Sequence, residues 1–529
     1  MSDKKDRLTP NRIAISNHSA SKVAAELPKP PKPQESLESA WAKAGQFKTR
    51  QVPQPQERQL QEPQLQAEQQ AQISDHDSVM ASLLMASSLF LGVGGAALSQ
   101  QAMANDQAST NPGAVTQASE SATEQDETDL LAGATIDAAL VYYREQDRVT
   151  AAEGIINYRQ ALDDTNIIRG KIALDALTGA SANGAVIQAR PQSFTRPSGT
   201  GVYQASSGEL PLDDTFKDTR LQLSANWQHL FSAKWQTSLG GYLSREYDYT
   251  SLGLNAGVEH SLNQSNTQVF AGAAYYFDIV NPVGGRPVGL SEMVFREDFA
   301  SEAEFRQAFD ATRYYDTALK RTLDLNVGVT QTLNRRWQAQ LSYGLSSVNG
   351  YLNDAYKVVS RIDTSGQAVG YHYEQRPDER LKHNLYLMTK GALDSGTLTF
   401  SYRYTDDDWS LQAHTFDARY RYNLSAGAFV QWQFRAYRQQ AAEFYHLYLT
   451  EAQPLPEFAS ADHRLGKMQT YTLGVKYGQR LEQGMLASVR LAYYQQRPQN
   501  PGVELPGELA AFDQFPRLDA IVLQFGMRF

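Results

Sequence analysis

The chain has 529 residues, no cysteine and a formal net charge of −9 at pH 7. The lack of cysteine excludes disulfides, zinc–thiolate sites and c-type haem attachment, and the acidic balance argues against a general nucleic-acid-binding protein. Gly occurs 36 times, Tyr 28 times and Phe 21 times. Only one apolar run approaches the length of about 18 residues that a transmembrane helix needs. These features favour a β-protein over a helical membrane bundle, and we predict no bound cofactor.

The amino-terminal quarter divides into three predicted regions. Residues 1–78 are rich in Pro, Gln, Glu and Lys and contain only two aromatic residues, so we predict a disordered extension. Residues 79–104 combine an apolar stretch with an A-x-A pattern, which predicts a signal-peptide-like segment cleaved after Ala104. The two aspartates before this segment and its distance from residue 1 argue against that interpretation. A misplaced start codon and an uncleaved anchor are the alternatives, and residues 105–134 form a polar linker.

From residue 135 onward the polarity alternates with a period of two, which is typical of strands that separate two different environments. Leu398, Phe400 and Tyr402 alternate with polar residues, for example. An outer-membrane barrel needs this pattern, because its strands face lipid outside and a polar lumen inside. We therefore predict an all-β, transmembrane antiparallel β-barrel over 135–529. Its sixteen strands are expected at 135–145, 151–162, 166–177, 217–229, 234–247, 249–263, 267–279, 318–333, 336–348, 381–391, 396–405, 412–424, 427–439, 468–481, 484–495 and 517–529.

The connections between these strands alternate in length, which tests the strand order independently. The longest connections, 178–216, 280–317, 349–380, 440–467 and 496–516, all fall on one side of the barrel. The other side carries only tight turns. This asymmetry predicts long extracellular loops and short periplasmic turns. The single residue at 248 is too short for a turn, so the two strands flanking it are drawn too long.

The last strand ends at the aromatic residue Phe529. Stepping back by twos gives Met527, Phe525, Leu523 and Ile521, whereas the intervening residues are small or polar except Val522. This strand resembles the carboxyl-terminal signal that the barrel assembly machinery reads in outer-membrane proteins, so we assign Phe525, Met527 and Phe529 to that signal. We expect the final strand to pair with the first, which would leave the sheet without a free edge.

Alternation also predicts which charged residues face the lumen. Arginine stays charged and binds carboxylate or phosphate bidentately, so an arginine wall would orient anionic solutes in a pore. The alternative is that these arginines pair with loop carboxylates and fill the lumen. The inward-facing charges expected in the carboxyl-terminal half are Arg403, Asp417, Arg419, Arg421, Arg435, Arg490 and Arg528, and Asp324 faces inward from an earlier strand.

Other clusters receive structural interpretations. Acidic groups at Asp213-Asp214, Asn353-Asp354 and Asp406-Asp407-Asp408 are favoured as arginine partners or solvated loop ends over Ca²⁺ ligands, because no defined ligand spacing is present. His446 and His463 share a loop but lack a metal-binding spacing, so no metal site is predicted. The Ser410 and His414 pair is the only hint of hydrolytic chemistry, and an enzyme is not favoured. Four tyrosine pairs at or near predicted strand ends are interpreted as interfacial residues: Tyr142-Tyr143, Tyr275-Tyr276, Tyr314-Tyr315 and Tyr493-Tyr494.

Several segments together carry a family resemblance. They are residues 210–219 (LPLDDTFKDT), 350–357 (GYLNDAYK), 376–378 (RPD), 401–409 (SYRYTDDDW), 414–421 (HTFDARYR), 444–445 (FY) and 459–462 (ASAD). Through them the region from about Ile136 to Phe529 resembles a widespread proteobacterial group catalogued only as a domain of unknown function. The resemblance implies an outer-membrane barrel in a Gram-negative bacterium and implies no reaction. Genes of that group often neighbour genes for small lipoproteins and for flavin-attachment or thiol-redox proteins.

Two functional hypotheses follow. The first is a porin-like, non-enzymatic channel with an arginine-lined lumen, and the second is a scaffold for a small lipoprotein or periplasmic partner, in envelope redox processes. The expected partners are outer-membrane lipid, the barrel assembly machinery and, for the scaffold, that small protein; no nucleic acid is expected.

Overall fold

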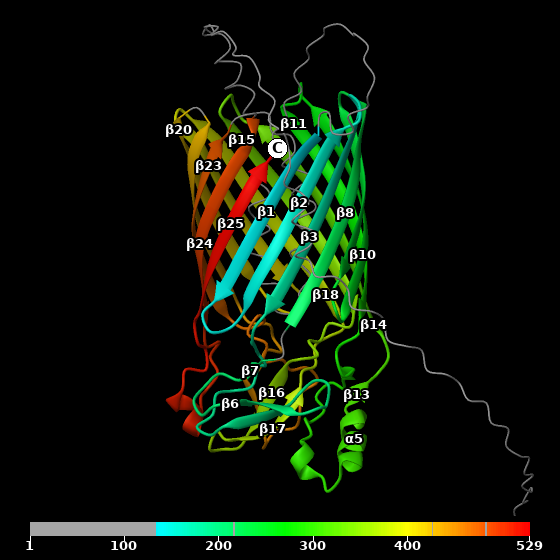
Figure 1. Ribbon diagram of the computed structural model, residues 1–529, viewed down its shortest axis with the longest axis vertical. Helices are drawn as coiled ribbons and strands as arrows, with labels where there is room; N and C mark the ends of the chain where they lie inside the picture. Colours follow the sequence, from blue (N-terminus) through cyan, green and yellow to red (C-terminus); the bar gives the residue numbers. More distant parts are fainter. Residues whose placement is uncertain (1–133, 215–216, 426, 482–483) are drawn as a thin grey trace, which may run out of the picture. The chain divides into compact units, whose positions relative to one another are not determined.

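A computed structural model describes residues 134–214, 217–425, 427–481 and 484–529. The extension, signal-like segment and linker predicted over residues 1–133 lie outside the described residues. Sixteen antiparallel strands form a closed barrel, as predicted (Figure 1). In barrel order they are β1 (Ala134–Glu145), β2 (Thr150–Ala161), β3 (Asn166–Thr178), β8 (Lys217–Ser232), β9 (Trp235–Arg245), β10 (Tyr249–Leu262), β11 (Thr267–Val280), β14 (Ala318–Thr332), β15 (Trp337–Gly350), β18 (Glu379–Leu393), β19 (Gly396–Asp407), β20 (Ala413–Ser425), β21 (Ala428–Gln439), β23 (Met468–Arg480), β24 (Leu486–Pro498) and β25 (Leu518–Arg528).

The barrel closes by pairing its first and last strands. β1 and β25 are antiparallel in a register that runs from Asp137 opposite Arg528 to Glu145 opposite Ala520. Backbone groups that would be orphaned at an open edge are therefore paired, as a lipid environment requires. Every predicted strand is present, and each boundary lies within three residues of the predicted one. The gap at residue 248 widens to a real turn, because β9 ends at Arg245 and β10 begins at Tyr249.

The sequence alternation separates an apolar exterior from a polar interior. Leu254, Leu473 and Leu491 are 73%, 57% and 57% exposed on the outside, whereas Ser251 and Gln340 on the inside are 0% and 1% exposed. A water-soluble protein buries leucine and exposes glutamine, so this distribution is inverted. The outer surface is therefore built for hydrocarbon.

The same alternation corrects the interpretation of the tyrosine pairs. Adjacent residues of a strand point to opposite faces, so only one tyrosine of each pair can lie at the lipid interface. Tyr142 is 40% exposed on the outside, whereas Tyr143 is 1% exposed. The pair Tyr314-Tyr315 lies in a long loop and not in a barrel strand.

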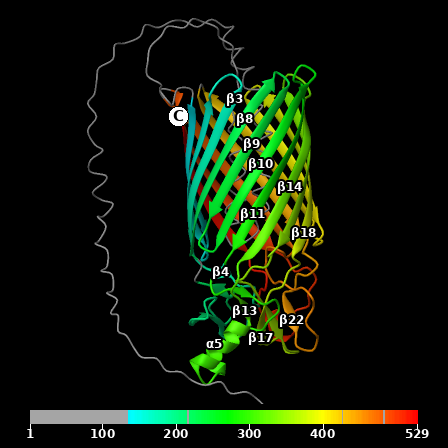
Figure 2. The ribbon, with the colours of Figure 1, turned by 90° about the vertical axis from the view of Figure 1, so that its right-hand side faces the viewer.

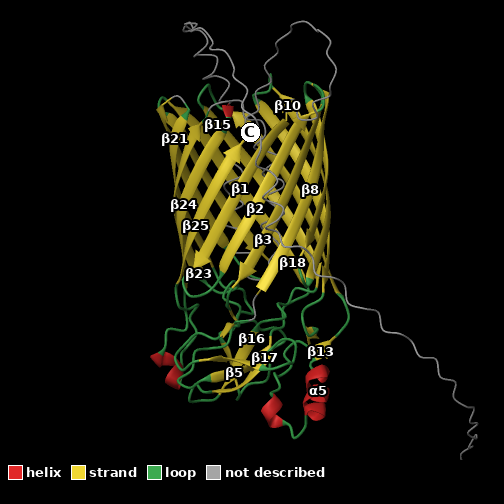
Figure 3. Ribbon diagram, viewed as in Figure 1, coloured by secondary structure: helices red, strands yellow, loops and turns green. Residues whose placement is uncertain are grey.

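The five long connections (residues 179–216, 281–317, 351–378, 440–467 and 499–517) gather at one end of the barrel, which we call the loop end (Figures 1 and 2). Their described residues form what we call the loop layer. The opposite turn end carries short turns and the carboxyl terminus, as Figure 3 shows. The loop layer contains β4 (Ser181–Ala182), β5 (Gln192–Thr195), β6 (Val202–Ala205), β7 (Leu212–Asp213), β12 (Arg286–Pro287), η2 (Arg296–Asp298), α5 (Glu302–Ala311), β13 (Arg313–Tyr314), β16 (Val358–Ile362), β17 (Ala368–Tyr373), β22 (Tyr448–Thr450) and η4 (Gly507–Ala511).

Loops far apart in sequence are bonded to one another within the layer. β16 pairs antiparallel with β17 and parallel with β22, which joins the third and fourth long loops. The side chain of Gln514 bonds both the backbone N–H and the carbonyl of Ile187, at 2.9 and 3.1 Å, which ties the fifth loop to the first. The layer also has its own apolar cores, one of them around Phe194 and Tyr371. The loops thus fold together as a packed structure.

The helix α5 is an element that the all-β prediction did not include. Ser301 caps its first turn, and Glu304 returns the bond to the Ser301 backbone in a capping box. Phe305 and Phe309 are buried on one face. None of the described helices is both long and apolar enough to cross a bilayer.

Candidate functional site: the barrel interior and the loop layer

The interior wall of the barrel is divided by charge. The inward positions of β18 to β25 carry two carboxylates, Asp407 and Asp417, and the following eleven basic residues: Arg380, Lys382, Lys390, Arg403, Arg419, Arg421, Arg435, Lys476, Arg480, Arg490 and Arg528. The inward positions of β1 to β15 carry eight carboxylates (Asp137, Glu145, Glu153, Asp175, Asp218, Glu259, Asp278 and Asp324) and five bases (Arg159, Arg169, Lys171, Arg220 and Lys320). One side of the interior is therefore strongly positive and the facing side is mildly negative.

Asp417 on β20 is the centre of a charged network on the positive wall. Its two carboxylate oxygens lie 2.9 Å from Arg419 Nε and 2.9 Å from the Arg435 guanidinium. The amide of Gln433 on β21 donates to the same carboxylate at 2.9 Å. Arg490 on β24 in turn donates to the Gln433 side-chain oxygen at 2.7 Å. One carboxylate thus orients several cations, and the group keeps a net positive charge.

The remaining predicted residues have separate surroundings. Arg403 lies over the Tyr386 ring and Arg421 over the Phe429 ring, with the guanidinium carbon 5.4 and 3.6 Å from the ring centres. Such cation–π contacts hold a guanidinium in place without neutralising it. Arg528 donates to Asp137 at 2.6 Å across the closing seam.

Three of these arginines form ion pairs with carboxylates of the barrel strands. The ion pairs of Arg419, Arg435 and Arg528 go to Asp417 and Asp137, which are both residues of barrel strands. Asp324 lies on β14, separated from the network by β15, and its charge interacts with that of Lys382 on β18. For these three arginines, an ion-pair partner lies within the wall itself.

An apolar patch interrupts the polar interior near the seam. Val141, Tyr143, Ile155, Leu177 and Val522 all face inward on β1, β2, β3 and β25, and each is at most 5% exposed. Alanines fill the gaps between them. Val522 was the one exception to the polar face predicted for the last strand, and this patch explains it. Apolar side chains on a lumen wall are unfavourable next to water, so the patch marks a distinct part of the interior.

A second concentration of charge lies in the loop layer. Asp462 lies 2.8 Å from the Arg376 guanidinium and 2.8 Å from Arg464 Nε, and Arg464 also reaches Asp354 at 2.5 Å. Arg376 Nε completes the group with Glu374 at 2.7 Å. We call these five residues the ionic cluster. Arg376, Glu374, Asp354 and Asp462 are each at most 5% exposed.

Neighbouring polar groups join the ionic cluster to three loops. The Ser460 hydroxyl donates to Glu374, and Lys357 Nζ donates to the carbonyl of Ala182 at 2.5 Å. Residues of the first, third and fourth long loops therefore meet at one buried point. Because unpaired buried charges are costly, each loop is held in place by the others.

The pKa values in this cluster follow from burial and from the nearby cations. Burial opposes ionisation of Asp462, but the Arg464 and Arg376 guanidinium groups outweigh it and hold its pKa well below the ordinary value. Burial raises the pKa of Glu374, against the opposing effect of Arg376. Burial also lowers the pKa of His463 to about 3, so its imidazole is neutral at physiological pH.

Sequence reasoning missed this cluster although the signal for it was present. Asp354, Arg376 and Asp462 each belong to a segment that carries the family resemblance, at 350–357, 376–378 and 459–462. Nothing in the sequence indicated that these three segments meet in space. The segments most specific to this type of chain thus build the loop layer and not the arginine wall.

The other candidate sites resolve into structural roles. One aspartate of each acidic group forms an ion pair with an arginine. The pairs are Asp214 with Arg196 at 3.1 Å, Asp354 with Arg464, and Asp407 with Arg380. β19 extends to Asp407, so this cluster belongs partly to a strand and not to a loop as predicted. No group of three potential metal ligands occurs within the described ranges.

The histidine and serine candidates are also separated by the structure. His463 Nδ1 lies 3.8 Å from Asp462, and His446 is not part of that contact. Ser410 donates its hydroxyl to Glu443 at 3.2 Å, whereas His414 bonds the Tyr402 hydroxyl on the outer surface at 2.7 Å. Ser410 and His414 therefore have different partners.

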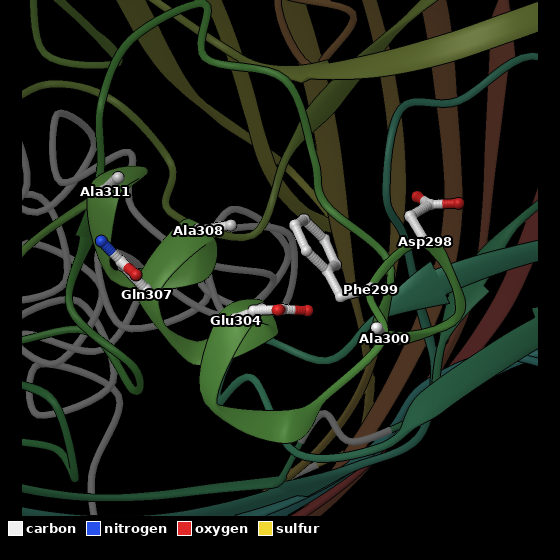
Figure 4. Close-up of a pocket in the computed structure, with 7 residues that line it drawn as sticks. All are labelled: Asp298, Phe299, Ala300, Glu304, Gln307, Ala308 and Ala311. Atoms are coloured by element: carbon white, nitrogen blue, oxygen red, sulfur yellow. The ribbon is translucent and has the colours of Figure 1, made fainter.

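An open pocket of about 490 Å³ lies in the loop layer between η2 and α5 (Figure 4). Phe299, Asp298 and Glu304 contribute to its lining, with three alanines and Gln307. One carboxylate oxygen of Glu304 is occupied by the backbone N–H of Ser301 in the capping box. The pocket belongs to the loop layer and is separate from the charged interior wall.

Comparison with known proteins places the chain in a family. The family model described as "Protein of unknown function (DUF3570)" matches residues 81–529. The chain belongs to this family. The match extends the predicted resemblance, which covered about Ile136 to Phe529, to an earlier starting point. No curated relative matches the DUF3570 chain in sequence.

Solved structures show low similarity to this DUF3570 protein. A bacterial polysaccharide outer membrane secretin is 10% identical with a TM-score of 0.36, and the match covers 75% of this chain and 98% of that one. The outer membrane protein OpdK from Pseudomonas aeruginosa is 8% identical, with a TM-score of 0.31 and coverage of 75% and 98%. The CymD monoaromatic hydrocarbon channel is 8% identical, with a TM-score of 0.33 and coverage of 75% and 88%. Similarities this low carry no information on what the DUF3570 chain binds.

Proposed function

We propose that this protein is a non-enzymatic outer-membrane channel that favours anionic polar solutes. The apolar exterior and closed sheet suit a bilayer, and a loop layer at one end with short turns at the other suits an outer membrane. The loop end is then extracellular and the turn end periplasmic.

The observation that carries the proposal is the charge division of the interior wall. Eleven bases against two carboxylates on β18 to β25 create a positive potential along one side of the barrel. In a confined, low-dielectric passage such a potential concentrates anions and repels cations. Arg419 and Arg435 are held by Asp417, so their positions are fixed in advance of any solute.

The test is conductance of the purified full-length chain in planar bilayers under a salt gradient. We expect ion-conducting steps with a reversal potential that indicates anion preference. Replacing Arg419→Glu together with Arg435→Glu removes two positive charges and adds two negative ones, so the preference should shift toward cations. The milder pair Arg419→Gln with Arg435→Gln should produce a smaller shift in the same direction.

The matched control is Arg419→Lys with Arg435→Lys, which keeps the charge and should keep the ion preference. A folded protein that inserts but never conducts would contradict the channel. Conduction with unchanged selectivity in both the Glu and Gln pairs would contradict the role of the arginine wall.

A scaffold for a small lipoprotein or periplasmic protein is the second candidate. The observation that favours it is the inward apolar patch around Tyr143 and Val522, whose side chains are buried, because a wall that excludes water is less suited to an aqueous pore. Its test is native mass spectrometry of the protein purified from its own membrane. A stoichiometric small protein combined with a silent bilayer would favour the scaffold over the channel.

A further inference from the structure

The outward-facing cations of the barrel are confined to one end. Within the described barrel strands, six Lys or Arg side chains occupy outward positions and are exposed. Each lies within four residues of the strand terminus at the loop end. They are Arg144, Lys217, Arg245, Arg321, Arg438 and Arg497.

The outward carboxylates of the described barrel strands are Glu379, Asp406 and Asp519, which also lie at the loop end. The remaining outward positions of these strands carry no Asp, Glu, Lys or Arg. The six cations therefore stand at the border of the apolar band, on the side of the long loops. At this depth in a bilayer the charged headgroups of lipids are found.

Two of these cations form the best-defined pair. Arg438 on β21 is opposite Gln469 on β23, and Gln469 is opposite Arg497 on β24. The two arginines are therefore two strand spacings apart, or about 10 Å, on the same face. The guanidinium groups of two long side chains can converge on one anion across that distance.

One member of the pair is held in place and the other is available. Arg497 Nε donates to the side-chain oxygen of Gln495, and its guanidinium carbon lies 5.5 Å from the centre of the Tyr471 ring. Tyr471 in turn donates to Gln469 at 3.2 Å. The Arg438 side chain is exposed and has no hydrogen-bond or ion-pair partner in the described part of the chain.

The nearest outward carboxylate does not neutralise this pair. Asp519 lies 2.7 Å from Arg517 Nε and accepts from Gln495 at 2.9 Å. Below the pair, toward the turn end, the surface consists of apolar side chains that include the exposed Leu473 and Leu491. A ligand for this surface must place an anion at the arginines and hydrocarbon against the leucines.

We propose that Arg438 and Arg497 bind the phosphate group of a phosphorylated lipid in the leaflet at the loop end. Guanidinium groups bind phosphate through charge-assisted, bidentate hydrogen bonds. The acyl chains of the lipid then cover the apolar band beneath. This inference rests on the proposed placement of the barrel in an outer membrane but not on conduction.

The experiment uses the full-length protein purified in a zwitterionic detergent and titrated with lipid, with native mass spectrometry as the readout. The probes are lipid A carrying two phosphates, the same lipid after phosphate removal, and inorganic phosphate. We expect tight binding of the phosphorylated lipid only. Arg438→Gln with Arg497→Gln should weaken that binding by at least about tenfold, as expected for loss of two charge-assisted contacts.

The matched control is Arg336→Gln, which removes an exposed arginine that is paired with Asp394 in a turn at the opposite end. It should leave lipid binding unchanged. Heat-modified migration of each variant on gels checks that the barrel is folded. Arg438→Lys with Arg497→Lys, which keeps the charge, should retain an intermediate affinity.

Three results would overturn the proposal. The first is that Arg438→Gln with Arg497→Gln binds the phosphorylated lipid as tightly as the unmodified protein does. The second is that the unmodified protein binds the dephosphorylated lipid as tightly as the phosphorylated one, and the third is that it binds inorganic phosphate as tightly as the lipid. Arg438→Gln with Arg497→Gln should leave conductance unchanged, so failure of lipid binding and failure of the channel are distinguishable.

Discussion

Single residues contribute most to stability where their charge is buried away from solvent. Asp462 pairs with both Arg376 and Arg464 and is buried, so bulk water cannot solvate the two guanidinium groups if its carboxylate is removed. The same is true of Asp417 on the interior wall, which is shared by Arg419 and Arg435. In both places one carboxylate fixes two cations, so its removal breaks two ion pairs at once, whereas removal of either arginine breaks only one of the two.

Replacing Asp462→Asn should therefore destabilise the loop layer by about 3 kcal/mol, the usual cost of breaking a buried ion pair. Hydrogen exchange over residues 440–467 would measure this as faster exchange, while the barrel strands remain protected. The control is Asp316→Asn, which breaks an ion pair with Arg286 where the aspartate side chain is 68% exposed. Surface pairs contribute about 0–1 kcal/mol, so equal effects of the two changes would contradict the role of the ionic cluster.

His463 gives the loop layer a dependence on pH. Its pKa is about 3 in the folded layer and 6.5 in an ordinary setting, so the opened loop binds a proton more readily than the folded one. The contribution of His463 to the stability of the loop layer is therefore fully present above pH 6.5. It is lost as the pH falls toward 3, by at most about 1.4 kcal/mol per pH unit. The ring is 26% exposed, which lessens the effect. Exchange measured at pH 7 and pH 5 should show this slope, and His463→Gln should reduce it.

At the scale of elements, the seam between β1 and β25 decides whether the sheet is a barrel. Ala138 lies opposite Met527 in this register, and Phe525 lies opposite Leu140. The chain has no native cysteine, so a pair of introduced thiols reports on the seam without interference.

Ala138→Cys with Met527→Cys should form a disulfide on mild oxidation, because directly opposed strand residues have Cβ atoms about 5 Å apart. Ala138→Cys with Phe525→Cys is the control. Its side chains are diagonal to each other, at about 7–8 Å, and should crosslink poorly. Migration on non-reducing gels distinguishes the two. Equal crosslinking of both pairs would contradict the register of the seam, and crosslinking of neither would contradict closure.

At the scale of the whole molecule, charge division and the closed wall act together. Net positive charge on β18 to β25 influences ions only across distances that salt leaves unscreened. The screening length is about 10 Å at 0.1 M salt and about 3 Å at 1 M. We therefore expect anion preference in bilayers to be large at 0.1 M KCl and to fall markedly at 1 M, as measured from reversal potentials at constant gradient. A preference independent of salt would place selectivity in a narrow contact site instead of the wall.

The sequence by itself determined the barrel, its sixteen strands and the side on which the long loops lie. These features follow from local rules, because alternation has a period of two and lipid selects apolar side chains outward along every strand. The same alternation predicts which arginines share a face with Asp417. Only the tertiary structure decided which residues from distant segments come into contact. Asp354, Arg376 and Asp462 meet in one cluster, and Val522 joins an apolar patch with Tyr143, because loop packing and the closing register bring together residues that no local pattern connects.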